Sequence, residues 1–171
     1  MSHVVLLGDS IFDNAAYVRG GPDVIRQLRD ALPAGWRATL AAVDGAVTGA
    51  VAHQMKRLPP DASLLVVSVG GNDALRHLGI FEDASRTIAD AVTRLGAIGD
   101  GFARDYEAML DAVRARALPT AVCTIYEPRF SDLRQRRLAA TGLMVLNDCI
   151  TREAFARGLS LIDLRLICDS R

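Results

Sequence analysis

The sequence lacks an excess of charge of either sign. Its 20 lysine and arginine residues balance 20 aspartate and glutamate residues. A protein that binds nucleic acid more often carries a basic patch, so we expect no nucleic-acid partner. The sequence also lacks an apolar run near the roughly 20 residues that span a bilayer. The apolar stretch from Val4 to Leu7 is short and has no cationic leader, unlike a secretory signal. We therefore expect a cytoplasmic protein without a membrane span.

Cysteine is scarce as well. Cys123, Cys149 and Cys168 are odd in number, widely spaced and set among apolar residues. This pattern favours buried, reduced thiols in a cytosolic protein over a disulfide framework. A catalytic cysteine would be expected beside a candidate base, and none lies nearby in the sequence.

Half of the 171 residues are hydrophobic, which is enough for one globular domain over 1–171. The β-rich runs are short and mostly continuous in their apolar character, which is typical of strands covered on both faces in a parallel sheet. They occupy 3–7, 38–43, 63–69, 120–126 and 159–164.

Helical patterns separate these runs. Pro22 marks one helix start, and Val24, Ile25, Leu28 and Leu32 form its apolar stripe. A shorter helix over 47–60 ends at two prolines. The stretch 81–118 has helical periodicity twice, interrupted by the glycines of "GAIGDG", and its second half places 102, 106, 109, 110 and 113 on one face. The last helix is expected within 131–157, with Ser131 or Asp132 as its cap.

This alternation predicts an α/β fold, namely a doubly wound, five-stranded parallel sheet with helices on both faces. It is a flavodoxin-like, three-layer α/β/α arrangement. Because such sheets bind ligands at the carboxyl ends of their strands, the segments that follow the strands are the candidates for a functional site.

The first strand ends in "GDSIFDN". Gly8 permits a sharp turn, and Ser10 follows it at a position where a hydroxyl can face a cleft. The alternative is that Ser10 only caps the turn. The segment lacks the glycine spacings that cradle phosphate, which disfavours a phosphate-binding or nucleotide-binding protein.

The next two strand ends supply hydrogen-bond donors. Gly45 follows the second strand and could point its N–H into the cleft, although it could equally be an ordinary turn glycine. Asn72 follows the third strand, and its neutral amide suits a developing oxyanion. Alternatively, Asn72 makes local bonds to the backbone.

Together these segments resemble the SGNH, or GDSL-type, hydrolase family. The resemblance is carried by Gly8-Asp9-Ser10, by Gly45 and by Gly70-Gly71-Asn72-Asp73, in this order after the first three strands. It implies a serine hydrolase that cleaves carboxylic esters, such as acyl or acetyl esters, with a small-molecule substrate and no metal or organic cofactor. It further implies that Ser10 is the nucleophile and that the Ser10 N–H, the Gly45 N–H and the Asn72 side chain form the oxyanion hole.

The family's last block, Asp-x-x-His, does not occur here, because no histidine follows Asp163 or Asp169. A serine hydroxyl needs a base within hydrogen-bond reach. In one explanation the chain lacks its C-terminal catalytic segment, which carries histidine or a carboxylate. In a second, one of the three histidines serves as the base instead. His3 begins the first strand, far from Ser10, which leaves His53 and His77. The alternative for these two is that they are ordinary helix residues. In a third, the protein is a non-catalytic member of the fold that binds a small ligand.

The fourth strand is followed by "YEPRFSD". Glu127, Arg129 and Asp132 are candidates to line the substrate side, where an arginine could hold an anionic group. The alternative is a solvated loop that ends in a helix cap.

Overall fold

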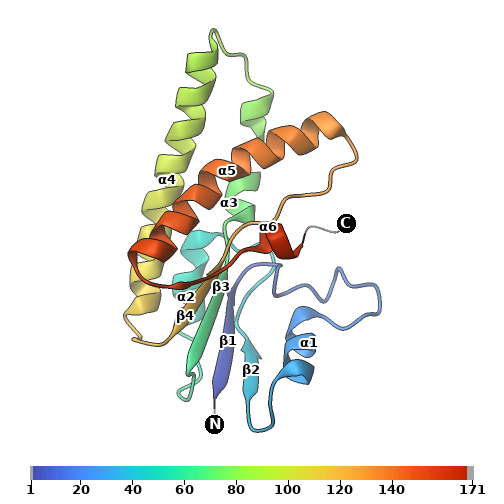
Figure 1. Cartoon of the computed structure of the whole chain (residues 1–171), viewed down its shortest axis with the longest axis vertical. Helices are drawn as coiled ribbons and strands as arrows, with labels where there is room; N and C mark the ends of the chain where they lie inside the picture. Colours follow the sequence, from blue (N-terminus) through green and yellow to red (C-terminus); the bar gives the residue numbers. More distant parts are fainter. Residues whose placement is uncertain (1, 169–171) are drawn as a thin grey trace.

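The strands form a single five-stranded sheet in the computed structural model, which describes residues 2–168. Their order is β2-β1-β3-β4-β5, and every neighbouring pair is parallel (Figure 1). The predicted α/β fold with a parallel sheet is confirmed, with strand ends that shift by one to three residues. The strands are β1 (His3–Gly8), β2 (Arg37–Leu40), β3 (Leu64–Ser68), β4 (Thr120–Cys123) and β5 (Ser160–Ile162).

Helices cover both faces of this sheet, as predicted. Val5 and Leu7 of β1 point to one face, where they pack with α2 (Val51–Met55), α4 (Ile88–Arg114) and α5 (Leu133–Ala156). Val4 and Leu6 point to the other face, toward α1 (Val24–Ala31) and α6 (Leu164–Ile167). Because side chains alternate along a strand, a continuously apolar strand requires a helix layer on each side.

The N-terminal halves of α4 and α5 extend past the carboxyl ends of the strands (Figure 1). Two short segments follow β3, namely α3 (Gly71–Leu75), which contacts α5, and the single-turn helix η2 (Leu78–Phe81). A similar short helix, η1 (Thr48–Ala50), precedes α2. The carboxyl edge of the sheet is therefore covered by helices.

The predicted break in the helix at "GAIGDG" is wrong, because α4 runs without interruption from Ile88 to Arg114. Gly99 lies where α4 meets α5, and a Cβ atom added there would be 2.4 Å from Cγ1 of Val145. Glycine in a helix interior costs about 1 kcal/mol relative to alanine. Here the close approach of the two helices outweighs that local preference.

The C-terminal elements differ from the prediction by a few residues. The helix predicted within 131–157 is confirmed as α5, although it is not the last, because α6 follows β5. Asp132 is the cap of α5, since its side chain accepts a hydrogen bond from the Gln135 N–H. The last strand is shorter than predicted, since the carboxylate of Asp163 accepts the Arg165 N–H and starts α6.

The three cysteines are free, as predicted, but they are not all buried. Cys123 is buried, Cys149 is half-buried and Cys168 is exposed. Burial raises the pKa of the Cys123 thiol to about 12, so Cys123 is protonated at neutral pH. In the part of the chain that the structure describes, no helix is both long and apolar enough to cross a bilayer.

Candidate active site

The nucleophile candidate is held by the turn that ends β1. Gly8 has φ +125°, and an added Cβ would lie 1.7 Å from the Ser68 carbonyl oxygen on β3. Only glycine fits this approach. The buried side chain of Gln54, on α2, accepts the Gly8 N–H at 2.7 Å and donates to the Gly8 carbonyl at 2.8 Å. The Gln54 side chain thereby pairs both backbone polar groups of Gly8 at a level beyond the end of β2.

Asp9, and not Ser10, caps the following turn. The Asp9 N–H donates to the Ser68 carbonyl, and the buried Asp9 side chain accepts the Ile11 N–H at 3.1 Å. Ser10 is half-buried, and no hydrogen bond involves its hydroxyl or its N–H within residues 2–168. The turn-capping alternative for Ser10 therefore does not describe this geometry.

The Asp9 carboxyl is electrostatically unusual. Burial raises its pKa to about 6, and the nearby carboxylates of Asp73 and Asp44 add to the increase. The hydrogen bond from Ile11 acts in the opposite direction without cancelling it. A buried carboxyl with a perturbed pKa beside a cleft is a feature that clusters at functional sites.

The segment after β3 is tied to the segment after β2. Asn72 Nδ2 donates to the Ala46 carbonyl at 2.9 Å, and the Asp73 carboxylate accepts the Thr48 N–H. Asn72 therefore reaches across 26 residues, and the alternative of local side-chain bonds is wrong. An amide has two N–H donors, so one remains available to a ligand.

Gly45 lies beside this tie, in an exposed turn with φ +78°. The hydrogen bonds found among residues 2–168 leave the Gly45 N–H unused. Ser10 and Asn72 line one cavity, whereas Gly45 is outside its lining. The structure thus brings two of the three predicted site residues together and places the third next to Ala46, the partner of Asn72.

That cavity has a volume of about 160 Å³ and lies over the carboxyl ends of the strands. Its apolar walls come from α3, η2, α4, α5 and the loop after β4. Its polar lining residues come from the ends of β1 and β3, from α3 and the turn after it, and from the loop after β4, and are Asp9, Ser10, Ser68, Asn72, His77 and Tyr126. A chiefly apolar hollow with a few polar groups at one side is typical of a small-molecule site.

The three histidines occupy different regions. His3 is buried at the opposite end of β1, where its ring contacts Asp61 and Thr39, as expected for a residue remote from Ser10. His53 is exposed on α2. His77 is exposed but lines the Ser10 cavity. Asp169 lies outside the described residues.

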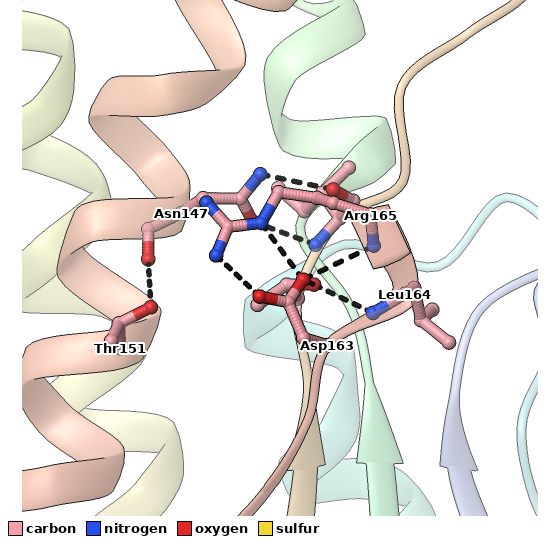
Figure 2. Close-up of polar contacts among 7 residues, drawn as sticks. Asn147, Thr151, Asp163, Leu164 and Arg165 are labelled. Carbon is pink, nitrogen blue, oxygen red and sulfur yellow. Dashed lines mark hydrogen bonds and ion pairs between the residues drawn. The ribbon is translucent and has the colours of Figure 1, made fainter. Parts of the chain in front are cut away.

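The end of β4 has its own polar network (Figure 2). Asn147 of α5 accepts the Ile125 N–H at 2.7 Å and donates to the Ile125 carbonyl at 2.9 Å, just as Gln54 does at Gly8. Thr124 donates to Asp163, and hydrogen bonds from Arg165 lower the pKa of Asp163 to about 2. Asp163 is therefore an anion that is already fully engaged.

The loop after β4 contributes to the cavity through other residues than predicted. Tyr126, Pro128 and Phe130 line the cavity, whereas Glu127, Arg129 and Asp132 do not. Arg129 instead donates to the Cys168 carbonyl, and Asp132 caps α5. The solvated-loop alternative fits these three charged residues. No cluster that could hold a metal ion occurs within residues 2–168.

Gln54 and Asn147 were not among the residues predicted at the site, although the sequence carries a signal for both. Each is a polar residue on the buried side of a helix, with Val51 and Met55 flanking Gln54 and with 146 and 150 flanking Asn147. An amide at such a position must find partners, because an unpaired buried polar group is costly.

Comparisons with known proteins agree with this architecture. The model of the GDSL-like Lipase/Acylhydrolase family matches residues 6–171. An extracellular lipase from Streptomyces rimosus is 16% identical, with a TM-score of 0.69 over 97% of this chain and 81% of that one. A phospholipase A1 from Streptomyces albidoflavus NA297 is 20% identical, with a TM-score of 0.68 over 96% and 80%.

A third similar structure is AlinE4, a SGNH-hydrolase family esterase. It is 21% identical, with a TM-score of 0.68 over 98% of this chain and 79% of that one. At these identities the similarity shows a shared fold. A search of curated proteins found no match.

Proposed function

The chain belongs to the GDSL-like lipase/acylhydrolase family, and from that premise we propose that it hydrolyses carboxylic esters with Ser10 as the nucleophile. The family supports ester or acyl hydrolysis in general. The observation that carries the finer assignment is the position of Ser10, whose hydroxyl is free of hydrogen bonds within residues 2–168 and lines an apolar cavity.

In the proposed reaction, Ser10 Oγ attacks the ester carbonyl carbon, and a base takes the hydroxyl proton. The carbonyl oxygen becomes an oxyanion, which accepts hydrogen bonds from the Ser10 N–H, the Gly45 N–H and Asn72 Nδ2. The alcohol leaves with the proton, and water then releases the acid from the acyl-serine. Donors fixed before the reaction stabilise the oxyanion without reorganising.

Three features support these donor roles. The N–H groups of Ser10 and Gly45 are not used by the hydrogen bonds among residues 2–168. The bond from Asn72 to the Ala46 carbonyl fixes the amide while leaving its second N–H available. The same bond links Asn72 to the residue that follows Gly45.

Hydrolysis of p-nitrophenyl acetate and butyrate tests the assignment. We expect Ser10→Ala to reduce the rate to that of the blank, while Ser131→Ala, an exposed serine before α5, leaves it unchanged. Asn72→Ala should lower kcat about 10²-fold with little change in KM, because removing one oxyanion donor costs roughly 3 kcal/mol.

Asn72→Ala also cuts the tie to Ala46, so Asp73→Ala serves as its control. Asp73→Ala cuts the companion tie to Thr48 and leaves the amide in place. Hydrolysis by Ser10→Ala at the wild-type rate would overturn the nucleophile assignment. A wild-type protein that binds the ester without turnover would instead be a non-catalytic, ligand-binding member of the family.

A further inference from the structure

The Ser10 cavity continues well beyond the polar groups at the strand ends. Its far walls are apolar and come from Leu95 and Ile98 on α4 and from Leu143 and Leu146 on α5. No titratable side chain lies in this deeper part, because the polar lining residues are confined to the ends of the strands, α3, its following turn and Tyr126. Such a space suits a hydrocarbon chain and not a second polar group.

The size of the cavity limits what it can hold. An apolar protein cavity of about 150 Å³ holds one benzene molecule, which has six carbons. The Ser10 cavity, at about 160 Å³, is of this size. A volume of this size holds about six carbons, so the walls of the cavity can contact an acyl chain that is longer than acetyl and shorter than the chains of membrane lipids.

Phe81 of η2 forms one wall of this space. The ring rests on Gly142 of α5, so closely that a Cβ at Gly142 would lie 2.9 Å from Phe81 Cζ. Glycine in the interior of a long helix is otherwise unfavourable. At this position it makes room for the aromatic ring.

A second hollow adjoins the cavity at Phe81. The two share Leu78, Phe81, Phe130 and Ala139, and the second is also lined by charged residues of the surface such as Glu82 and Arg134. Phe81 is thus one of four residues that separate a chiefly apolar space from a partly charged one. Removing its ring would enlarge the Ser10 cavity toward the second hollow.

We propose that the substrate is an ester of a medium-chain acid and that Phe81, seated on Gly142, sets the upper limit of its acyl chain at about six carbons. This inference rests on the proposed function, because it places the ester carbonyl at Ser10. Phe81 acts here as a specificity-determining residue and takes no part in bond breaking.

The first test is the dependence of kcat/KM on acyl length. The probes are p-nitrophenyl acetate, butyrate, hexanoate, octanoate and decanoate, each below its solubility limit. For wild-type protein we expect kcat/KM to rise roughly fourfold per methylene up to hexanoate, from the burial of each CH₂. We expect it to fall at least tenfold from hexanoate to decanoate.

Two variants should move this profile in opposite directions. Phe81→Ala should shift the best substrate to octanoate or decanoate, and Leu95→Phe, which fills the space, should shift it to acetate or butyrate. Phe155→Ala is the matched control, since Phe155 is 90% exposed on α5 and should leave the profile unchanged. Phe81→Leu, checked by thermal melting, serves where the alanine variant does not fold.

The alcohol part provides a second control. In acetate esters of ethanol, hexanol and decanol, the dependence of kcat/KM on alcohol length should be the same for Phe81→Ala as for the wild-type protein, since the cavity is assigned to the acyl part. A flat or acetate-preferring wild-type profile would overturn the proposal, as would a Phe81→Ala effect that follows the alcohol.

A binding readout separates this inference from the catalytic one. Isothermal titration of the Ser10→Ala variant with hexanoate and decanoate requires no turnover. We expect hexanoate to bind more tightly than decanoate, and Phe81→Ala in the same background to reverse the order. If Ser10 is not the nucleophile but this reversal occurs, the proposed catalysis fails and the chain-length assignment holds. If Ser10 is the nucleophile and no reversal occurs, only the chain-length assignment fails.

Discussion

The buried carboxyl of Asp9 leads to a quantitative prediction about stability. Burial raises the Asp9 pKa from 3.8 to about 6 in the folded protein. The folded state therefore binds this proton more tightly than the unfolded state does. The destabilisation is absent below about pH 4, grows as pH rises from about 4 to 6, and is complete above about pH 6.

The expected magnitude follows from the size of the shift. A rise from 3.8 to about 6 is roughly two pH units, and each unit corresponds to about 1.36 kcal/mol, so the full effect is about 3 kcal/mol. Asp9→Asn removes the charge and retains the oxygen that accepts the Ile11 N–H. We therefore expect Asp9→Asn to raise the free energy of unfolding by up to about 3 kcal/mol near pH 8 and by almost nothing near pH 3.5.

Urea unfolding followed by circular dichroism, from about pH 3.5 to pH 8, measures this difference. Asp30→Asn is the control, because Asp30 is exposed on α1. A stability difference for Asp9→Asn that does not change with pH, or that shrinks as pH rises, would show that burial does not raise the Asp9 pKa in the folded protein. A positive result would show that the residue next to Ser10 is kept at a cost to stability.

Two further predictions concern residues around Ser10. Gln54→Met should lower the free energy of unfolding, measured in urea, by about 2–4 kcal/mol, because it leaves the buried Gly8 N–H unpaired and removes one donor from the Gly8 carbonyl. Asn147→Leu, which removes the equivalent hydrogen bonds at Ile125, should destabilise the protein similarly. In ester kinetics, Gln54→Met should also lower kcat, whereas Asn147→Leu should act mainly on KM. His77→Gln should lower kcat/KM by less than tenfold in the same ester assay, because no hydrogen bond within residues 2–168 orients the His77 ring. A loss of 10²-fold or more would instead indicate that His77 is the base.

Much of the fold could be predicted from local patterns. The continuously apolar runs predicted strands covered on both faces, and alternation of Val4 and Leu6 with Val5 and Leu7 between two helix layers is what that pattern requires. The continuity of α4 could not be predicted in this way. It depends on the contact of Gly99 with Val145, which are far apart in the sequence.

In the candidate site, too, some features follow from local sequence patterns and others depend on contacts between distant parts of the chain. Gly8, Ser10 and Asn72 were predicted to lie at the site because glycines and polar residues at strand ends are local signals. Whether Asp9 or Ser10 caps the turn was not decidable from sequence, since both side chains cap turns well. The structure assigns the cap to Asp9. The bond from Asn72 to Ala46 depends on the arrangement of two loops, which no local pattern encodes.

Covalent labelling with a fluorophosphonate probe, read by intact mass and peptide mapping, tests directly whether Ser10 is the nucleophile. We expect one adduct per chain, on Ser10, absent from Ser10→Ala and formed more slowly in Asn72→Ala. Labelling that persists in Ser10→Ala, that maps to another residue, or that does not occur in the wild-type protein would contradict this role of Ser10.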